Sequence, residues 1–262
     1  MKPIAQFPDH LKPQVRYVLT DIDDTLTIDG QITSVAFKAM ERLKKSGIHV
    51  FPITGRPAGW CDHIARMWPV DGVVGENGAF YFRYDRKLKK MKRRYLKPAQ
   101  ERKKDRKRLE KIGSKILEKI LGCRVASDQA YRETDLAIDY CEDVPELPMK
   151  KVEQIVRCFK QAGAQAKVSS IHVNGWFGDH DKLTTTLLLF KEVFNVNLDE
   201  IKNQVIFTGD SPNDSPMFAY FPHAVGVADI LRFKGKMEYE PAWVTKRKGG
   251  YGFAEMVDIL LR

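Results

Sequence analysis

Three acidic side chains follow an apolar stretch near the N-terminus. Asp21, Asp23 and Asp24 come directly after residues 15–20, which have the apolar pattern of a buried strand. Carboxylates crowded in this way repel one another and raise one another's pKa unless a cation neutralises them. Mg²⁺ prefers a hard, oxygen-rich site of this kind. The cluster therefore predicts a magnesium site at the end of a strand.

A second acidic cluster follows another apolar strand in the same manner. Residues 209–214 read Gly-Asp-Ser-Pro-Asn-Asp, and the glycine allows a sharp turn that lets Asp210 and Asp214 face one crevice. Open α/β sheets bind ligands at the carboxyl ends of their strands, so the two acidic loops are expected to share one metal. Such a site suits phosphoryl transfer, in which a carboxylate attacks phosphorus and a second one, Asp23, supplies the acid.

The elements that must position these residues alternate between strand and helix patterns, which favours a parallel α/β sheet. Strand patterns cover residues 15–20, 48–54, 72–74, 205–208 and 224–227, and helix patterns cover residues 33–45, 57–67, 182–194, 216–220 and 253–261.

The middle of the chain has a different rhythm. It predicts a hairpin, a basic helix, a strand, a second helix and a further strand, over residues 79–95, about 102–120, 135–140, 148–162 and 166–173. We interpret this as an α+β unit inserted into the first. The expected division is a catalytic core of residues 1–79 and 180–262 and a cap of residues 80–179.

Four short motifs carry a resemblance to a known family. Residues 21–27 (Asp-Ile-Asp-Asp-Thr-Leu-Thr) resemble the first motif of the haloacid dehalogenase superfamily, and residues 52–56 resemble its second. Lys182 matches the lysine of the third motif, and residues 209–214 match the fourth. The resemblance implies a Rossmann-like three-layer core, and the position of the insertion implies a type IIB cap. Residues 77–79 and 169–174 are similar to the sugar-phosphate phosphatases of sucrose phosphate, trehalose phosphate and mannosyl phosphoglycerate.

The resemblance also implies roles for individual core residues. Asp21 would be the nucleophile and a metal ligand, and Asp23 would be the general acid and base while giving its main-chain carbonyl to Mg²⁺. Thr54 and the Gly55 amide would bind the transferring phosphoryl group, and Lys182 would neutralise its charge. Asp210 and Asp214 would complete the metal site. The remaining residues expected to touch phosphate or substrate are Arg56, Asn77, Ser170, His172 and Asn174.

Composition limits the possible partners. The net charge is +10, and residues 83–124 alone hold 19 Lys and Arg against 5 Asp and Glu. We interpret this segment as a solvated cap face, ahead of attraction of anionic substrates, and nucleic acid is disfavoured because no recognition motif accompanies it. The four scattered cysteines indicate reduced thiols. No apolar run suits a membrane span, no motif predicts a protein partner, and the N-terminus lacks a signal-peptide pattern, so the cytoplasm is the expected location.

The sequence predicts a Mg²⁺-dependent phosphatase that hydrolyses a small phosphomonoester, with a sugar phosphate favoured, through an aspartyl-phosphate. Two alternatives stay open. A phosphomutase of the phosphomannomutase type would use the same chemistry with a different acceptor of the phosphoryl group. A protein that binds nucleic acid or other anions through a basic cap would use the core only as a scaffold.

Overall fold

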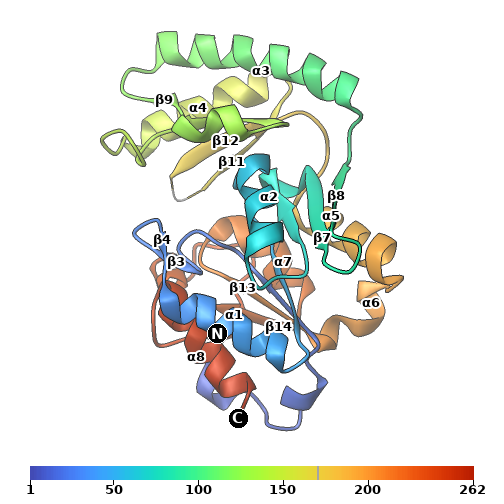
Figure 1. The fold of residues 1–262 in the computed structure, drawn as a ribbon. Helices are drawn as coiled ribbons and strands as arrows, with labels where there is room; N and C mark the ends of the chain where they lie inside the picture. The colour runs from blue at the N-terminus through green and yellow to red at the C-terminus, as the bar shows by residue number, and fades with distance from the viewer. Residues whose placement is uncertain (170) are drawn as a thin grey trace.

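A six-stranded parallel sheet forms the centre of the core (Figure 1). The computed structural model describes residues 1–169 and 171–262. The strand order is β1-β15-β14-β13-β2-β5, and every neighbouring pair is parallel. The bounds are β1 Lys2–Pro3, β15 Trp243–Val244, β14 His223–Gly226, β13 Val205–Gly209, β2 Tyr17–Thr20 and β5 His49–Pro52.

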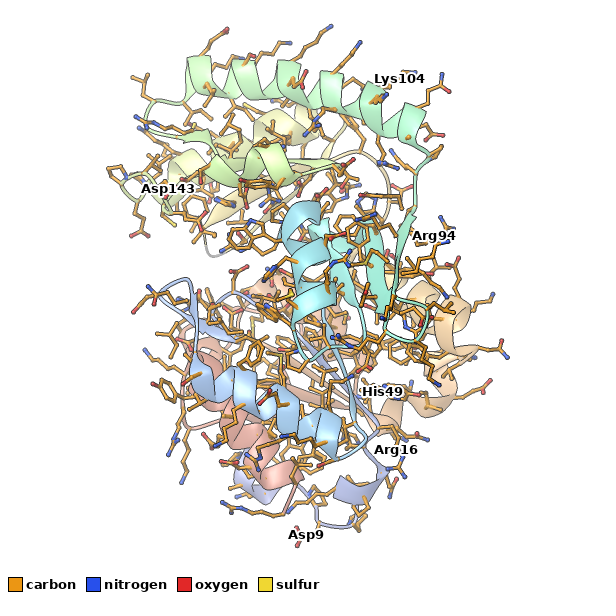
Figure 2. The ribbon with its side chains drawn as sticks, in the orientation of Figure 1. Asp9, Arg16, His49, Arg94, Lys104 and Asp143 are labelled. Carbon is orange, nitrogen blue, oxygen red and sulfur yellow. The ribbon has the colours of Figure 1, made fainter. Side chains whose placement is uncertain are left out.

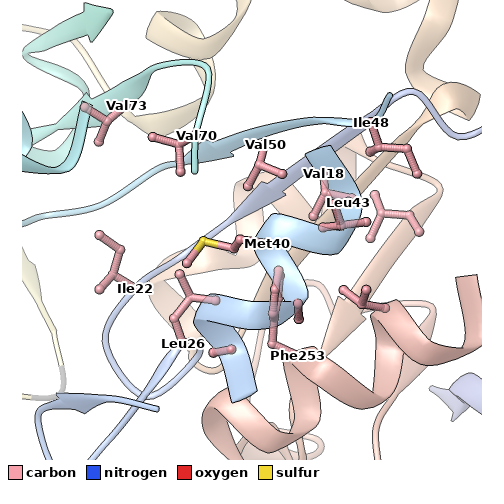
Figure 3. Close-up of a cluster of buried hydrophobic side chains, with 14 of the residues drawn as sticks. Val18, Ile22, Leu26, Met40, Leu43, Ile48, Val50, Val70, Val73 and Phe253 are labelled. Atoms are coloured by element: carbon pink, nitrogen blue, oxygen red, sulfur yellow. The ribbon is translucent and has the colours of Figure 1, made fainter. Parts of the chain in front are cut away.

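Alternating side chains of these strands point to opposite faces of the sheet, and helices cover both faces. Val18 of β2 packs on one side and its neighbour Leu19 on the other. Figure 3 shows the first cluster, where Val18 lies near Met40 and Phe253 from two different helices. The helices on the Val18 side are α1 Ser34–Lys45, α2 Ala58–Met67 and α8 Gly249–Leu260. The helices on the Leu19 side are α5 Lys182–Leu189, a π turn Phe190–Phe194 and α7 Ser215–Tyr220, with the short α6 Leu198–Ile201 nearby. The predicted α/β core with a parallel sheet is confirmed.

The third predicted strand is present as β6 (Val73–Gly75), which continues the core beyond β5. A parallel bridge joins Val74 of β6 to Ile53, and the Thr54 amide donates to the Val74 carbonyl at 2.9 Å. On its other side, β6 pairs antiparallel with β7 (Phe80–Asp85), which pairs with β8 (Lys90–Tyr95). The sequence pattern did not reveal this change of direction, which the short loop between β6 and β7 allows.

A second sheet lies above the core, with the strand order β11-β12-β10-β9 and antiparallel pairing throughout. Its strands are β11 Gln165–Val168, β12 His172–Trp176, β10 Asp135–Asp139 and β9 Arg124–Val125. Two helices, α3 (Ala99–Lys119) and α4 (Met149–Gln161), pack on one face of this sheet through a separate apolar cluster. We call the unit formed by these elements the cap.

One predicted cap strand proved to be two. The sequence pattern predicted a single strand over residues 166–173, whereas β11 and β12 are two antiparallel strands in which Val168 pairs with Val173. The Ser169 hydroxyl accepts a hydrogen bond from the His172 amide at 3.0 Å, and the Ser169 amide donates to the His172 carbonyl at 2.8 Å. The serine side chain competes with the extended backbone, which the apolar pattern does not reveal.

The cap sheet has two different faces because its side chains alternate. Leu136 and Ile138 of β10 enter the cap's apolar cluster. Asp135 and Asp139 alternate with them on the opposite face, the one that contributes to the site described below, and both are buried. On β12, His172 and Asn174 share that polar face.

The hairpin of β7 and β8 packs with the core rather than with the cap. Phe80 and Phe82 enter the same cluster as α1 and α2, and Tyr81 enters the cluster on the other side of the sheet. The predicted domain boundary between residues 79 and 80 stays a prediction. Because the hairpin packs with the core, we propose a boundary after Tyr95, where the cap would begin.

Several lysines of α3 lie exposed on the helix. Figure 2 shows Lys104 on the side of α3 that faces away from the core, and Lys103, Lys104 and Lys107 are exposed. Among the described residues, no helix combines the length and the apolar character that a membrane crossing needs.

Candidate active site

The two acidic loops meet because their strands are neighbours. β2 pairs with β13 in a register that sets Thr20 beside Thr208, so the loops that follow leave the sheet together. Oxygen atoms of Asp21, Asp210 and Asp214 all lie within 4.8 Å of one another, and all three residues are buried. Gly209 makes this possible, because a Cβ atom there would lie 2.3 Å from Oδ2 of Asp214. Three of the four predicted metal-binding residues are thereby brought together through their side chains.

Lys182 supplies the positive charge of this cluster. It is the first residue of α5, whose N-cap Asp181 accepts a hydrogen bond from the Thr184 amide. The Lys182 ammonium lies 3.0 Å from Oδ2 of Asp21 and 2.9 Å from Oδ1 of Asp214. Burial alone would lower the pKa of Lys182, but the two carboxylates outweigh it and raise that pKa. A single ammonium thus bridges two of the three acidic residues.

The acidic cluster has the properties of a site for a hard divalent cation. Burial is the main cause that raises the pKa of Asp210 well above its ordinary value, and Asp214 and Asp21 add to it. Burial likewise raises the pKa of Asp21 to about 7, although Lys182 opposes the shift. Within the described residues, Oδ2 of Asp210 is buried without a hydrogen-bond partner. An oxygen-only set with one unsatisfied carboxylate oxygen fits Mg²⁺.

The Asp23 carboxylate points to Arg56 instead of the acidic cluster. Nε of Arg56 donates to both Asp23 oxygens, at 2.9 and 3.0 Å, and Nη2 donates to Oδ1 at 2.8 Å. Arg56 is buried to 4% exposure. The predicted contribution of Asp23 to the metal through its main-chain carbonyl stays a prediction.

The cap reaches the same guanidinium from above. Oε1 of Glu142, in the loop after β10, lies 3.3 Å from Nη1 of Arg56, and Asp128 lies 3.7 Å from it. Nε2 of His172 lies 2.8 Å from the other oxygen of Glu142. His172 and Arg56 together lower the pKa of Glu142 to about 2. Core and cap are therefore joined by a chain of polar contacts, from Asp23 through Arg56 and Glu142 to His172.

A second buried arginine joins the cap to the loop that follows β5. Arg132 donates hydrogen bonds to the carboxylate of Asp128 and to that of Asp135. Its Nη1 also donates to the Gly55 carbonyl at 3.0 Å. Asn174 donates to Oδ2 of Asp135 at 3.1 Å. Asn174 therefore lies against the carboxylate that orients Arg132.

The turn after β6 carries the side-chain amide of Asn77, whose nitrogen has no hydrogen-bond partner among the described residues. Glu76, Asn77 and Gly78 all have positive φ, at 43°, 55° and 102°. In the described residues, Nδ2 of Asn77 is buried without a hydrogen-bond partner, and the Asn77 side chain lies close to Gly55. Thr54 is fully buried just before that glycine, and its hydroxyl accepts a hydrogen bond from the Arg56 amide at 3.0 Å. The Asn77 amide is thus available to donate to an oxygen of a bound ligand.

One cavity between core and cap collects most of the predicted site. It has a volume of about 20 Å³, little more than a water molecule needs. Its walls include Asp21, Asp23, Gly55, Arg56, Asn77, His172, Asn174, Lys182 and Asp210 of the predicted residues. Asp214 and Thr54 lie buried behind this wall. The prediction for Ser170 falls outside the described residues.

Sequence reasoning missed several residues of the site. Arg132 and Glu142 are cap residues that meet the core only after docking, and Ser211 and Asn213 line the cavity beside Asp210. The alternation of residues 135–139 (Asp-Leu-Ala-Ile-Asp) was the available signal, because it placed two carboxylates on one face of a buried strand.

A comparison with protein families agrees with the resemblance that the first two motifs carry. Residues 18–114 match the family model of the haloacid dehalogenase-like hydrolases. The resemblance to the haloacid dehalogenase superfamily is confirmed. The matched part contains the first two motifs, and the third and fourth lie beyond it. A search among curated proteins by sequence finds no match.

Several solved structures share the fold over nearly the whole chain. A protein of Thermoplasma acidophilum is 18% identical with a TM-score of 0.70, and the match covers 94% of this chain and 98% of that one. The sucrose-phosphatase of Synechocystis, solved with sucrose and phosphate, is 15% identical with a TM-score of 0.64 and coverages of 94% and 98%. A trehalose-6-phosphate phosphatase related protein is 14% identical with a TM-score of 0.60 and coverages of 94% and 95%. These similarities establish the core with an inserted cap.

Proposed function

We propose that this protein is a Mg²⁺-dependent phosphatase that hydrolyses a small phosphomonoester, with a sugar phosphate favoured, through an aspartyl-phosphate. The observation that carries the proposal is the position of the Lys182 ammonium between Asp21 and Asp214, at 3.0 and 2.9 Å, beside the buried Asp210. The family description as hydrolases and the sucrose-phosphatase among the similar structures support it. The cytoplasmic location stays a prediction.

The residues divide the reaction into two steps. An Asp21 oxygen forms a bond to phosphorus while the bond from phosphorus to the leaving oxygen breaks, and Asp23 gives that oxygen its proton. Asp23 then takes a proton from water, whose oxygen attacks phosphorus and releases phosphate and free Asp21. Lys182 balances the charge of the transferring group in both steps. Asp21, Asp210 and Asp214 would hold Mg²⁺, which supplies charge neutralisation for the phosphate oxygens when bound.

The structure suggests how Asp23 becomes available for proton transfer. Its carboxylate is held by Arg56, so it must leave that guanidinium before it can reach a leaving oxygen. Glu142 and Asp128 already lie 3.3 and 3.7 Å from Nη1 of Arg56 and can take over its charge. The cap carboxylates would thus release Asp23 when a ligand is bound.

The first test is phosphate release from a panel of sugar phosphates, nucleotides and other phosphorylated metabolites, with and without Mg²⁺. We expect Mg²⁺-dependent release by the wild type and none by Asp21→Asn. Asp23→Asn should slow turnover about 10²- to 10⁴-fold, because a positioned acid contributes that much. Turnover by Asp21→Asn equal to that of the wild type would refute the mechanism. Isomer formation that needs a sugar bisphosphate would select the phosphomutase, which no observation here favours.

A further inference from the structure

An aromatic groove opens beside the active-site cavity. It lies between α2, the cap and a small hairpin formed by β3 (Thr27–Ile28) and β4 (Gln31–Ile32), which rises from the core next to α2 in Figure 1. Its volume is about 490 Å³, within the range of about 300 to 1,000 Å³ that is usual for small-molecule sites. The large apolar side chains of its wall are Ile32, Trp60, Ile64, Trp68 and Tyr131.

The groove adjoins the catalytic cavity. Asp23 and Arg56 line both spaces, and their ion pair stands on the boundary between them. The leaving oxygen of a substrate must lie within hydrogen-bond reach of Asp23, because that residue is proposed to protonate it. The cavity around Asp21 holds only about 20 Å³, so the carbon skeleton attached to the leaving oxygen does not fit there. The groove provides the space in which this skeleton can lie.

Two aromatic side chains are held at the groove by specific contacts. Trp60 lies in the first turn of α2, four residues after Arg56, whose guanidinium carbon lies 4.5 Å from the centre of the indole ring. Tyr131 comes from the cap and packs against Gly59, where a Cβ atom would lie 3.0 Å from the tyrosine Cβ. Yet Trp60 and Tyr131 are 42% and 57% exposed. Ring faces left open next to an active site favour a ligand that covers them.

The charges of the groove favour an uncharged occupant. Arg56 is the one Lys or Arg residue among the described residues that line it. That guanidinium is already matched by Asp23, Asp128 and Glu142. A leaving group with a second phosphate or a carboxylate would therefore find no unmatched Lys or Arg among the described residues that line the groove, and it would meet the Asp23 carboxylate.

We propose that this groove binds the leaving group of the substrate, and that this leaving group is an uncharged pyranose whose apolar face covers Trp60 and Tyr131. The inference rests on the proposed phosphatase function and adds the chemical class of the leaving group. A pyranose combines CH faces, which suit aromatic rings, with hydroxyl groups that Asp23, Arg56 and His63 can bond at the edges. In a sugar monophosphate the ring is at most one carbon from the leaving oxygen, which places it next to Trp60.

The test compares substrates that differ only beyond the phosphate. Glucose 6-phosphate is the pyranose probe, glycerol 3-phosphate lacks a ring, glucose 1,6-bisphosphate adds a charge, and adenosine monophosphate adds an aromatic base. We expect Trp60→Ala and Tyr131→Ala each to raise KM for glucose 6-phosphate about tenfold, which corresponds to about 1.4 kcal/mol of binding free energy. Both variants should leave kcat/KM for glycerol 3-phosphate within twofold. Trp60→Phe should restore most of the affinity.

A matched control and a binding measurement separate this inference from the proposed function. Tyr251→Ala removes an aromatic side chain on α8 that is also exposed, and it should change none of these constants. Calorimetric titration of Asp21→Asn with glucose 6-phosphate should show binding that the added Trp60→Ala change weakens about tenfold.

The outcomes fall into distinct groups. Equal effects of Trp60→Ala on glycerol 3-phosphate and glucose 6-phosphate would refute the groove as the ring site while leaving the phosphatase intact. No use of glucose 6-phosphate, or a larger effect on adenosine monophosphate, would refute the pyranose. A preference for glucose 1,6-bisphosphate would refute the uncharged leaving group. Release of phosphate by Asp21→Asn at the wild-type rate would instead overturn the proposed function.

Discussion

Asp210 combines two properties that oppose each other in the metal-free protein. It is 2% exposed, and its Oδ2 lacks a hydrogen-bond partner within the part of the chain that the structure describes, although the Arg232 guanidinium lies 3.6 Å from that oxygen. It also lies within 4.8 Å of two other carboxylates that share a single lysine. A group in this position is costly to the fold unless a cation binds, which is the usual compromise between stability and activity at a functional site.

This compromise predicts how Asp210→Asn changes stability. Without metal, the variant should be at least as stable to urea as the wild type, because one of three crowded carboxylates is gone. Mg²⁺ at 100 times its Kd should add about 2.7 kcal/mol to the free energy of unfolding of the wild type and much less to that of the variant. Glu118→Gln, an exposed change on α3, serves as the control. Equal stabilisation of Asp210→Asn and wild type by Mg²⁺ would remove this residue from the metal site.

At the residue scale, the sequence predicted the core half of the site better than the cap half. Asp21 and Asp210 follow two strands directly, so their meeting required only that the strands be neighbours in one sheet. Arg132 and Glu142 meet the core only when the cap is docked. No local pattern encodes that docking, because it depends on how two separately packed units fit together.

At the scale of elements, the segment after η4 (Ser127–Tyr131) is fixed to the core by one carboxylate. Glu76 is fully buried and accepts hydrogen bonds from the amides of Ala58, Glu133 and Thr134, at 2.9, 2.9 and 2.6 Å, and from the Thr134 hydroxyl. Lys97, in the first crossing between core and cap, lies against Gly178 in the second, where a Cβ atom would lie 3.1 Å from Cε of Lys97. The two crossings therefore lie side by side. A cap that opens about these crossings can keep its bonds to Glu76 while His172 and Glu142 move away from Arg56.

Glu76→Gln should loosen this attachment. An amide nitrogen would face backbone donors that now bond to a carboxylate, so we expect a loss of about 1 to 3 kcal/mol in the free energy of unfolding. Amide hydrogen exchange of Glu133 and Thr134 should accelerate more than exchange in β13.

Glu133→Gln provides the matched control on the same segment. Its side chain is half exposed and lies 3.6 Å from Arg102, so exchange at Thr134 should stay unchanged. Unaltered exchange of residues 133 and 134 in Glu76→Gln would show that the carboxylate does not hold the segment.

The sequence also predicted some helices and strands more accurately than others. Helices with a clear apolar stripe, such as α1 and α4, were expected within a few residues of their observed bounds. The π turn after α5 and the division between β11 and β12 were not, because both depend on hydrogen bonds of single residues rather than on periodicity.

At the scale of the whole molecule, the basic helix lies on the far side of the cap. α3 packs on the face of the cap sheet opposite to the one that carries His172 and Asn174. Some of its arginines have structural contacts, since Arg102 and Arg108 lie over the rings of Tyr95 and Phe177 at 3.7 and 3.5 Å. The outward lysines are separated from the cavity by the helix and the sheet.

Neutralising these lysines should therefore leave catalysis unchanged. We expect the triple change of Lys103, Lys104 and Lys107 to Gln to alter kcat/KM for the best phosphorylated substrate by less than twofold, with the same dependence on salt as the wild type. A shallower salt dependence would show that the helix attracts anionic substrates. Salt-sensitive RNA binding that the triple change abolishes would favour the nucleic-acid interpretation.

The overall fold was predictable because strand and helix patterns alternated on both sides of the insertion, and parallel sheets require such crossovers. The placement of the hairpin formed by β7 and β8 was not, because its apolar side chains, including Phe80 and Phe82, could have packed on either unit.

The alternation in the cap strands has a consequence for how relatives of this chain can diverge. On β12, positions 172 and 174 belong to the face that lines the cavity, whereas position 173 belongs to the cap's own interior. Substitutions at every second position can therefore change ligand preference without disturbing the packing that keeps the cap folded. The deletion of a single residue would do the reverse, because it would exchange the two sets along the rest of the strand. Inherited variation in this strand should thus consist of replacements and not of length changes.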